Sequence, residues 1–182
     1  MRELAQASLF HWTPERAIWI GGHTLSWDAR CAGIYAGFAL AAGYQLAASW
    51  RAWRVPPIRI LAIVGMFALP LFADVLSIAF GFRVPSNDVR FLTGLLFGAA
   101  LSIALLPAVL SLAAPTRRAA RNNTVRHFAP VLMGVAALFL LKHWDVAIVF
   151  AGIEGLCYAG FFALVGLLAA GLFLIVRRAT QP

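Results

Sequence analysis

The polar residues that could do chemistry gather near the ends of long apolar runs. Asp74 lies in "PLFADVLSIAF", with apolar neighbours on both sides. An ionised carboxylate in such surroundings is costly unless it is paired, hydrated or protonated. We therefore predict that Asp74 pairs with Arg30 or Arg90, which open the two neighbouring apolar runs. Two interpretations stay open: a ligand-binding cleft, or an ion pair that only sets the helix register. The residues of the predicted cleft are Arg16, Arg30, Asp74, Asn87 and Arg90.

A second group of side chains has the donor types of a zinc site. Imidazole, thiolate and carboxylate groups all bind zinc. The sequence contains no Cys-x-x-Cys or His-x-x-x-His spacing, so this prediction rests on donor type alone. A metal ion is the only cofactor that the sequence suggests. Its candidate ligands are His11, His23, Asp28 and Cys31.

The only two cysteines, Cys31 and Cys157, are expected at similar depth near the outer ends of two helices. Disulfides form and persist in oxidising compartments outside the cytoplasm. A disulfide between the two helices is therefore one interpretation. The other is a pair of free thiols packed among apolar side chains.

Composition shows what must position these residues. Of the 182 residues, 62% are hydrophobic and 12% are charged, and the mean hydropathy is +0.84. A soluble fold of this size cannot hide so much apolar surface. We predict an all-α integral membrane protein that crosses a prokaryotic cytoplasmic (inner) membrane several times and is surrounded by the lipid bilayer. The formal net charge is +8, but the basic residues lie between apolar runs, which indicates membrane topology rather than nucleic-acid binding.

A helix needs about 20 apolar residues to cross the hydrocarbon core. This length predicts about five spans in one transmembrane domain, residues 31–178. The short fourth span leaves four or six as alternatives. Residues 1–30 contain Trp12, Trp19 and Trp27 and are predicted to lie on the outer membrane interface, which tryptophan favours. The predicted spans are residues 31–50, 58–82, 91–114, 128–141 and 155–176.

Arginines define the predicted orientation. Alternate segments carry a basic excess, which the positive-inside rule assigns to the cytoplasm. The N-terminus is then outside and the C-terminus is cytoplasmic. The arginines that support this are Arg51, Arg54, Arg59, Arg117, Arg118, Arg121, Arg126, Arg177 and Arg178. The outer face then gathers further polar residues beside those of the cleft, namely Asp88, His143, Asp145 and Glu154.

Small residues predict one close helix contact. Gly33 and Gly37 in the first span, and Gly94 and Gly98 in the third, are each four residues apart. Glycines at this spacing share a helix face and let two backbones approach closely. We expect the first and third spans to pack together. Pro70 lies inside the second span and is expected to kink it.

The order of these residues resembles an uncharacterised family of small prokaryotic membrane proteins, known only as a domain of unknown function. The resemblance implies cysteines at two positions where this chain has Trp12 and Asp28, so a dithiol redox cycle is not expected here. It covers roughly residues 11–98 and implies no activity. The matching residues are His11, Pro14, Glu15, Arg16, Arg30, Cys31, Gly33, Asp74, Ser86, Asn87, Arg90, Thr93, Gly94 and Gly98.

Two functions compete on this sequence. The first is a small membrane protein whose outer polar cleft binds a metal ion or a small polar ligand. The alternative is a non-catalytic accessory subunit of a larger membrane complex, which the small size and the helices rich in small residues favour. An enzyme is less favoured, because the sequence contains no His-Glu-x-x-His, Gly-x-Ser-x-Gly or phosphate-loop motif. A thiolate pair of His11 with Cys31 is the one enzymatic interpretation that remains.

Overall fold

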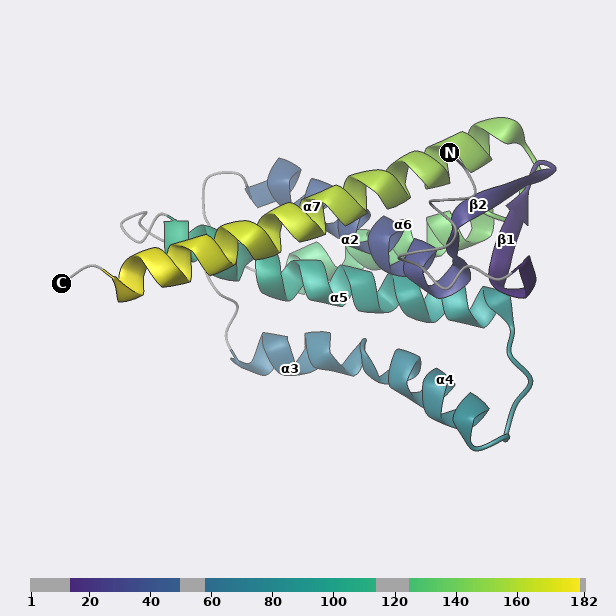
Figure 1. Cartoon of the computed structure of the whole chain (residues 1–182), viewed down its shortest axis with the longest axis horizontal. Helices are drawn as coiled ribbons and strands as arrows, with labels where there is room; N and C mark the ends of the chain where they lie inside the picture. The colour runs from purple at the N-terminus through teal and green to yellow at the C-terminus, as the bar shows by residue number, and fades with distance from the viewer. Residues whose placement is uncertain (1–13, 50–57, 114–124, 181–182) are drawn as a thin grey trace.

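The structure is a computed structural model that describes residues 14–49, 58–113 and 125–180. A bundle of helices carries a small β-hairpin at one end (Figure 1). The last helix ends at the opposite end of the bundle. In chain order the elements are η1 (Pro14–Arg16), β1 (Ala17–Ile20), β2 (His23–Asp28), α2 (Ala29–Ser49), α3 (Ile58–Met66), α4 (Leu69–Ala79), α5 (Asn87–Ala113), α6 (Val125–Leu141) and α7 (Ala147–Ala179).

Four segments of the described chain are long and apolar enough to cross a membrane. They are Ala29–Ala48, Leu61–Ala79, Asn87–Ala113 and Ala147–Ala179, and a shorter apolar helix covers Ala129–Leu141. The shorter helix lies where the fourth of the five spans was predicted, so the count of five is not confirmed. The chain is largely helical, as predicted, with one departure at the hairpin.

The second predicted span is interrupted, as Pro70 suggested. Helix α3 ends at Met66 and α4 begins at Leu69. Proline has no N–H to donate to the carbonyl four residues earlier, here that of Met66. The chain crosses the interruption in tight turns, in which the N–H of Phe67 donates to the Val64 carbonyl and that of Ala68 to the Gly65 carbonyl, each at 3.0 Å.

Helices α2 and α5 form the most extensive contact in the bundle. A Cβ added at Gly37 would overlap the Leu95 carbonyl, and one added at Gly98 would overlap the Ile34 carbonyl. Gly33 and Gly94 are equally close to the opposite backbone. The predicted packing of the first and third spans is therefore confirmed. Helix α7 approaches α2 in the same way, because Gly160 lies against the Tyr35 backbone.

Residues 17–28 form an antiparallel hairpin, which was not predicted for the N-terminal segment. Ile20 pairs with His23 across a two-residue turn, and both turn residues, Gly21 and Gly22, have positive φ. Two-residue turns with positive φ at both positions match the twist of a hairpin, and glycine adopts them without steric cost. Gly-Gly between two runs of β-forming residues predicts such a hairpin, and our sequence analysis overlooked it.

The hairpin buries one of its tryptophans. Trp27 is buried and packs edge-on against Tyr35, with ring centroids 4.8 Å apart, and its ring lies tilted against that of Phe161 at 5.3 Å. This ring fills the space between α2 and α7, and the interfacial position of residues 1–30 stays a prediction. Trp19 is exposed, and Trp12 lies outside the described residues.

Candidate functional site

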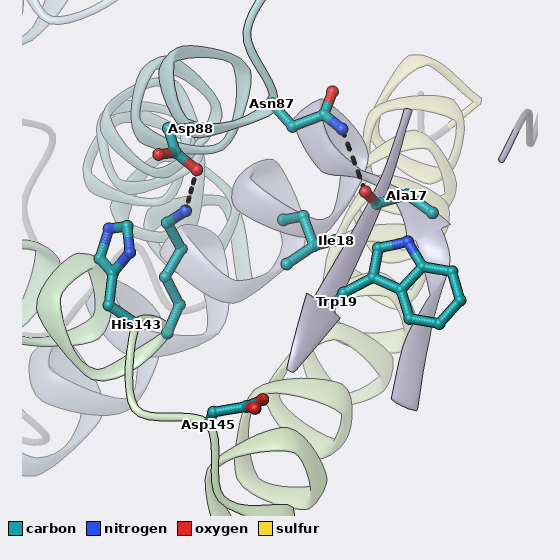
Figure 2. Close-up of a pocket in the computed structure, with 8 residues that line it drawn as sticks. Ala17, Ile18, Trp19, Asn87, Asp88, His143 and Asp145 are labelled. Carbon is teal, nitrogen blue, oxygen red and sulfur yellow. Dashed lines mark hydrogen bonds and ion pairs between the residues drawn. The ribbon is translucent and has the colours of Figure 1, made fainter. Parts of the chain in front are cut away.

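A polar pocket of about 300 Å³ lies at the hairpin end of the bundle. Three segments far apart in the sequence form its walls: strand β1, the start of α5, and the connection between α6 and α7 (Figure 2). The lining residues are Ala17, Ile18, Trp19, Asn87, Asp88, Lys142, His143 and Asp145.

Lys142 is the buried charge of this pocket. Its ammonium group pairs with a carboxylate oxygen of Asp88. The Lys142 side chain is only 5% exposed, whereas that of Asp88 is 54% exposed. The ammonium also lies 5.8 Å from the ring centroid of Phe91 and 5.2 Å from that of Phe139, where the electron-rich ring faces attract a cation. The ion-pair partner of Lys142 is thus a carboxylate that water or a ligand can still reach.

The polar residues of the pocket also attach the hairpin to the bundle. The Asn87 amide donates to the carbonyls of Glu15 at 2.9 Å and Ala17 at 3.0 Å (Figure 2 shows the second bond). The Asp145 carboxylate accepts a hydrogen bond from the N–H of Gly21 at the hairpin turn. A third bond lies outside the pocket, where Glu154 accepts from the N–H of Ser26 at 3.3 Å. These bonds hold the strand that forms the pocket wall in a defined position.

Glu154 lies within the last helix. Helix α7 begins at Ala147, before the predicted start of the fifth span at residue 155, which stays a prediction. The acid is tolerated within the helix because the hairpin supplies a backbone donor to it.

A second polar cluster surrounds Asp74, whose side chain is only 2% exposed. Arg30 donates to one of its carboxylate oxygens at 2.7 Å, and Arg83 pairs with the other. The predicted pairing with Arg30 is confirmed. The alternative with Arg90 is wrong, since Arg90 instead lies 3.4 Å from the amide oxygen of Asn87.

A turn at the end of α4 explains why Arg83 was missed. Gly81 has positive φ, its N–H donates to the Ile78 carbonyl, and the N–H of Phe82 donates to the Ser77 carbonyl. This pair of bonds is the Schellman motif that ends many helices and turns the chain back. The turn brings Arg83 to Asp74. The glycine after an apolar helix is the sequence signal that could have predicted the turn.

Ligand binding by the predicted cleft stays a prediction, and the structure gives its residues different partners. Arg30 and Asp74 belong to the ion-pair cluster, and Asn87 lines the pocket, with Arg90 beside it. Arg16 is exposed on η1. Asp88, His143 and Asp145 were expected at the outer face but were not included in the cleft. Their pocket depends on where α6 ends relative to α5, which local sequence patterns do not specify.

The described part of the predicted metal set does not converge. His23 stacks on Phe150, with ring centroids 5.1 Å apart, and the Asp28 carboxylate accepts the backbone N–H of Arg30 at 2.8 Å. Within residues 14–49, 58–113 and 125–180, no three His, Cys, Asp or Glu side chains form a group that could hold a metal ion. His11 lies outside these ranges. The prediction of a site that includes His23, Asp28 and Cys31 is therefore not supported.

Both cysteines are free thiols. Cys157 is buried, and its thiol donates to the Ala32 carbonyl at 3.4 Å. Cys31 is half-buried on α2. The disulfide interpretation is wrong for this structure, because the Cys157 thiol points at the α2 backbone, and the alternative of two packed thiols describes it.

The fold and its polar end define a helical membrane protein with a hairpin-capped bundle. The chain belongs to the family described as "Predicted membrane protein (DUF2085)", whose model matches residues 10–106, more than half of the chain. The match covers the hairpin and the Asp74 cluster, whereas Lys142, His143 and Asp145 lie beyond it. No curated protein and no solved structure is significantly similar to the chain.

Proposed function

We propose that this membrane protein binds a small polar ligand in the pocket beneath its β-hairpin. The observation that carries the proposal is the buried Lys142 ammonium, which shares the pocket with the half-exposed Asp88 carboxylate. A buried cation is expensive unless its hydrogen-bonding capacity is satisfied. An ammonium has three donors, and the cation–π contacts with Phe91 and Phe139 offer no acceptor oxygen.

The chemistry of the lining describes the ligand. Lys142 supplies donors, Asp88 and Asp145 supply acceptors, and His143 supplies either. The pocket volume of about 300 Å³ is at the small end for ligand sites. A compact molecule with both donors and acceptors fits this lining better than an apolar one.

The proposed orientation places the pocket outside the cell, at a prokaryotic inner membrane, with the C-terminus in the cytoplasm. It is supported by Arg177 and Arg178, which end α7 away from the hairpin. A fifth crossing is supported by the path of α6. Its C-terminal neighbour Lys142 contacts the start of α5 at the hairpin end, whereas α5 itself ends at the opposite end. The 17 residues of α6 would extend about 25 Å.

Native mass spectrometry of protein extracted from its own membrane in mild detergent tests the proposal. We expect a species heavier than the chain by one small molecule. Lys142→Met should lose it, because methionine keeps the apolar stem and removes the charge. Asp88 is half-exposed, so water can hydrate it in this variant and the fold should persist.

Arg177→Gln, which removes an exposed arginine at the far end of the bundle, is the matched control and should keep the added mass. The bare chain mass for wild type, or the same added mass in wild type and Lys142→Met, would reject the proposal. A species that contains other membrane subunits would instead favour the accessory-subunit alternative.

A further inference from the structure

The cluster around Asp74 carries more positive charge than its ion pairs use. Arg30 and Arg83 both bind the single Asp74 carboxylate and occupy both of its oxygens. Arg90 lies in the first turn of α5, one turn before Gly94, which packs against the Arg30 backbone, and the charges of Asp74, Asp28 and Arg16 also act on Arg90. Four arginines against two aspartates leave a formal charge of +2 at this site.

The arginines keep donors that the protein does not use. Among the described residues, the buried Nε of Arg30 has no hydrogen-bond partner. The Arg30 and Arg83 side chains are 27% and 35% exposed, so an anion can reach this side of the cluster. Guanidinium groups bind phosphate through paired N–H donors, which makes arginine well suited to such an anion.

The surroundings of Arg83 indicate where the anion comes from. Phe82 and Val84, on either side of it, are exposed, and so are Phe80 at the end of α4 and Phe72 and Leu76 within it. In a membrane protein, apolar side chains exposed on a helix face the lipid tails. The arginines lie at the end of this apolar surface, where a lipid that packs its tails against α4 would place its headgroup.

We propose that Arg30, Arg83 and Arg90 bind the phosphate of an anionic membrane lipid whose acyl chains lie along α4. This lipid site is separate from the polar pocket, because none of its three arginines lines that pocket. The apolar loop around Arg83 distinguishes it from a site for a soluble anion.

The test compares lipids that differ only in the phosphate headgroup. Delipidated full-length protein in detergent is mixed with phosphatidylglycerol and diacylglycerol of the same acyl chains, and the bound lipid is counted by native mass spectrometry. We expect wild type to retain phosphatidylglycerol preferentially. Arg83→Gln should weaken this retention about ten-fold, the effect of losing one charge-assisted contact.

Three further variants keep the test decisive. Arg90→Gln leaves both Asp74 ion pairs in place, so it should fold even where Arg83→Gln does not, and it should also weaken retention. Arg177→Gln removes one exposed arginine at the other end and should retain phosphatidylglycerol as wild type does. Lys142→Met should also retain it, which separates this site from the polar pocket.

Equal retention of the phospholipid by wild type and both cluster variants would overturn the proposal. Inorganic phosphate is the second ligand used in the test, and it distinguishes a lipid site from a site for a soluble anion. If millimolar phosphate raised the melting temperature of lipid-free protein through the same arginines and displaced phosphatidylglycerol completely, the site would be one for a soluble anion, and the lipid assignment would be wrong.

Discussion

Helices α2 and α5 on one side, and the α3–α4 segment on the other, are all apolar enough to cross a membrane, but they are attached to the molecule in different ways. The first pair meets backbone to backbone through Gly37 and Gly98. The α3–α4 segment lies beside α5 with most of its large apolar side chains exposed, and a buried ion pair to Asp74 ties its far end to α2. Lipid tails solvate apolar side chains as well as another helix does. Close approach and paired charges therefore determine which helices associate.

The strongest way to break this contrast is Gly37→Val. The added side chain would overlap the Leu95 backbone, which cannot move without separating α2 from α5. We expect a loss of more than about 4 kcal/mol in the free energy of unfolding, measured by denaturant titration in detergent. Gly43→Val is the matched control on the same helix, because nothing lies within 4 Å of a Cβ at Gly43. Equal stability of the two variants would contradict the role assigned to the glycine contact.

Asp74→Asn tests the attachment of α4. It leaves Arg30 and Arg83 without their counter-ion in a partly buried position, and breaking a buried pair in this way costs about 3 kcal/mol. The loss should appear in the same titration, together with faster proteolysis in the connection between α4 and α5. Arg83→Gln keeps the pair of Arg30 with Asp74 and should cost less. A variant Asp74→Asn as stable as wild type would show that packing alone holds α4.

Gly134→Ala should have the smallest effect and sharpens the contrast. A Cβ at Gly134 of α6 would meet the tip of the Leu40 side chain at 2.9 Å, and not a backbone atom. A leucine tip can move to another rotamer, so we expect a change below about 1 kcal/mol in the free energy of unfolding. A loss as large as that of Gly37→Val would mean that α6 contacts α2 as closely as α5 does.

The Asp74 cluster was predicted only in part from the sequence. An isolated carboxylate among apolar residues had to be paired, and Arg30 was one of two named partners. The second partner was missed, because it depends on the turn at Gly81 that brings Arg83 back along α4. The hairpin is a different case, since its Gly21-Gly22 turn is a local signal that was present and not used.

The pocket could not be derived in the same way. Asp88 and Lys142 are 54 positions apart, and each is an ordinary charged residue next to an apolar run. Their pairing depends on the positions of α5 and α6 around α2, and Asp145 reaches the hairpin only because α7 starts beside it. The sequence had already placed these side chains at the same end of the bundle, since all of them flank apolar helices on the side with fewer arginines.

Hydropathy, glycine spacing and the cost of an unpaired charge are properties of short segments of sequence. The sequence alone was therefore enough to predict the membrane class, the contact of α2 with α5 and the need to pair Asp74. Which charges meet is a property of distances between segments. Those distances follow from how the helices pack and how the hairpin binds across their ends. Packing therefore decided that Asp74 belongs to an ion-pair cluster facing the α4 surface and that Lys142 and Asp88 belong to a polar pocket beneath the hairpin.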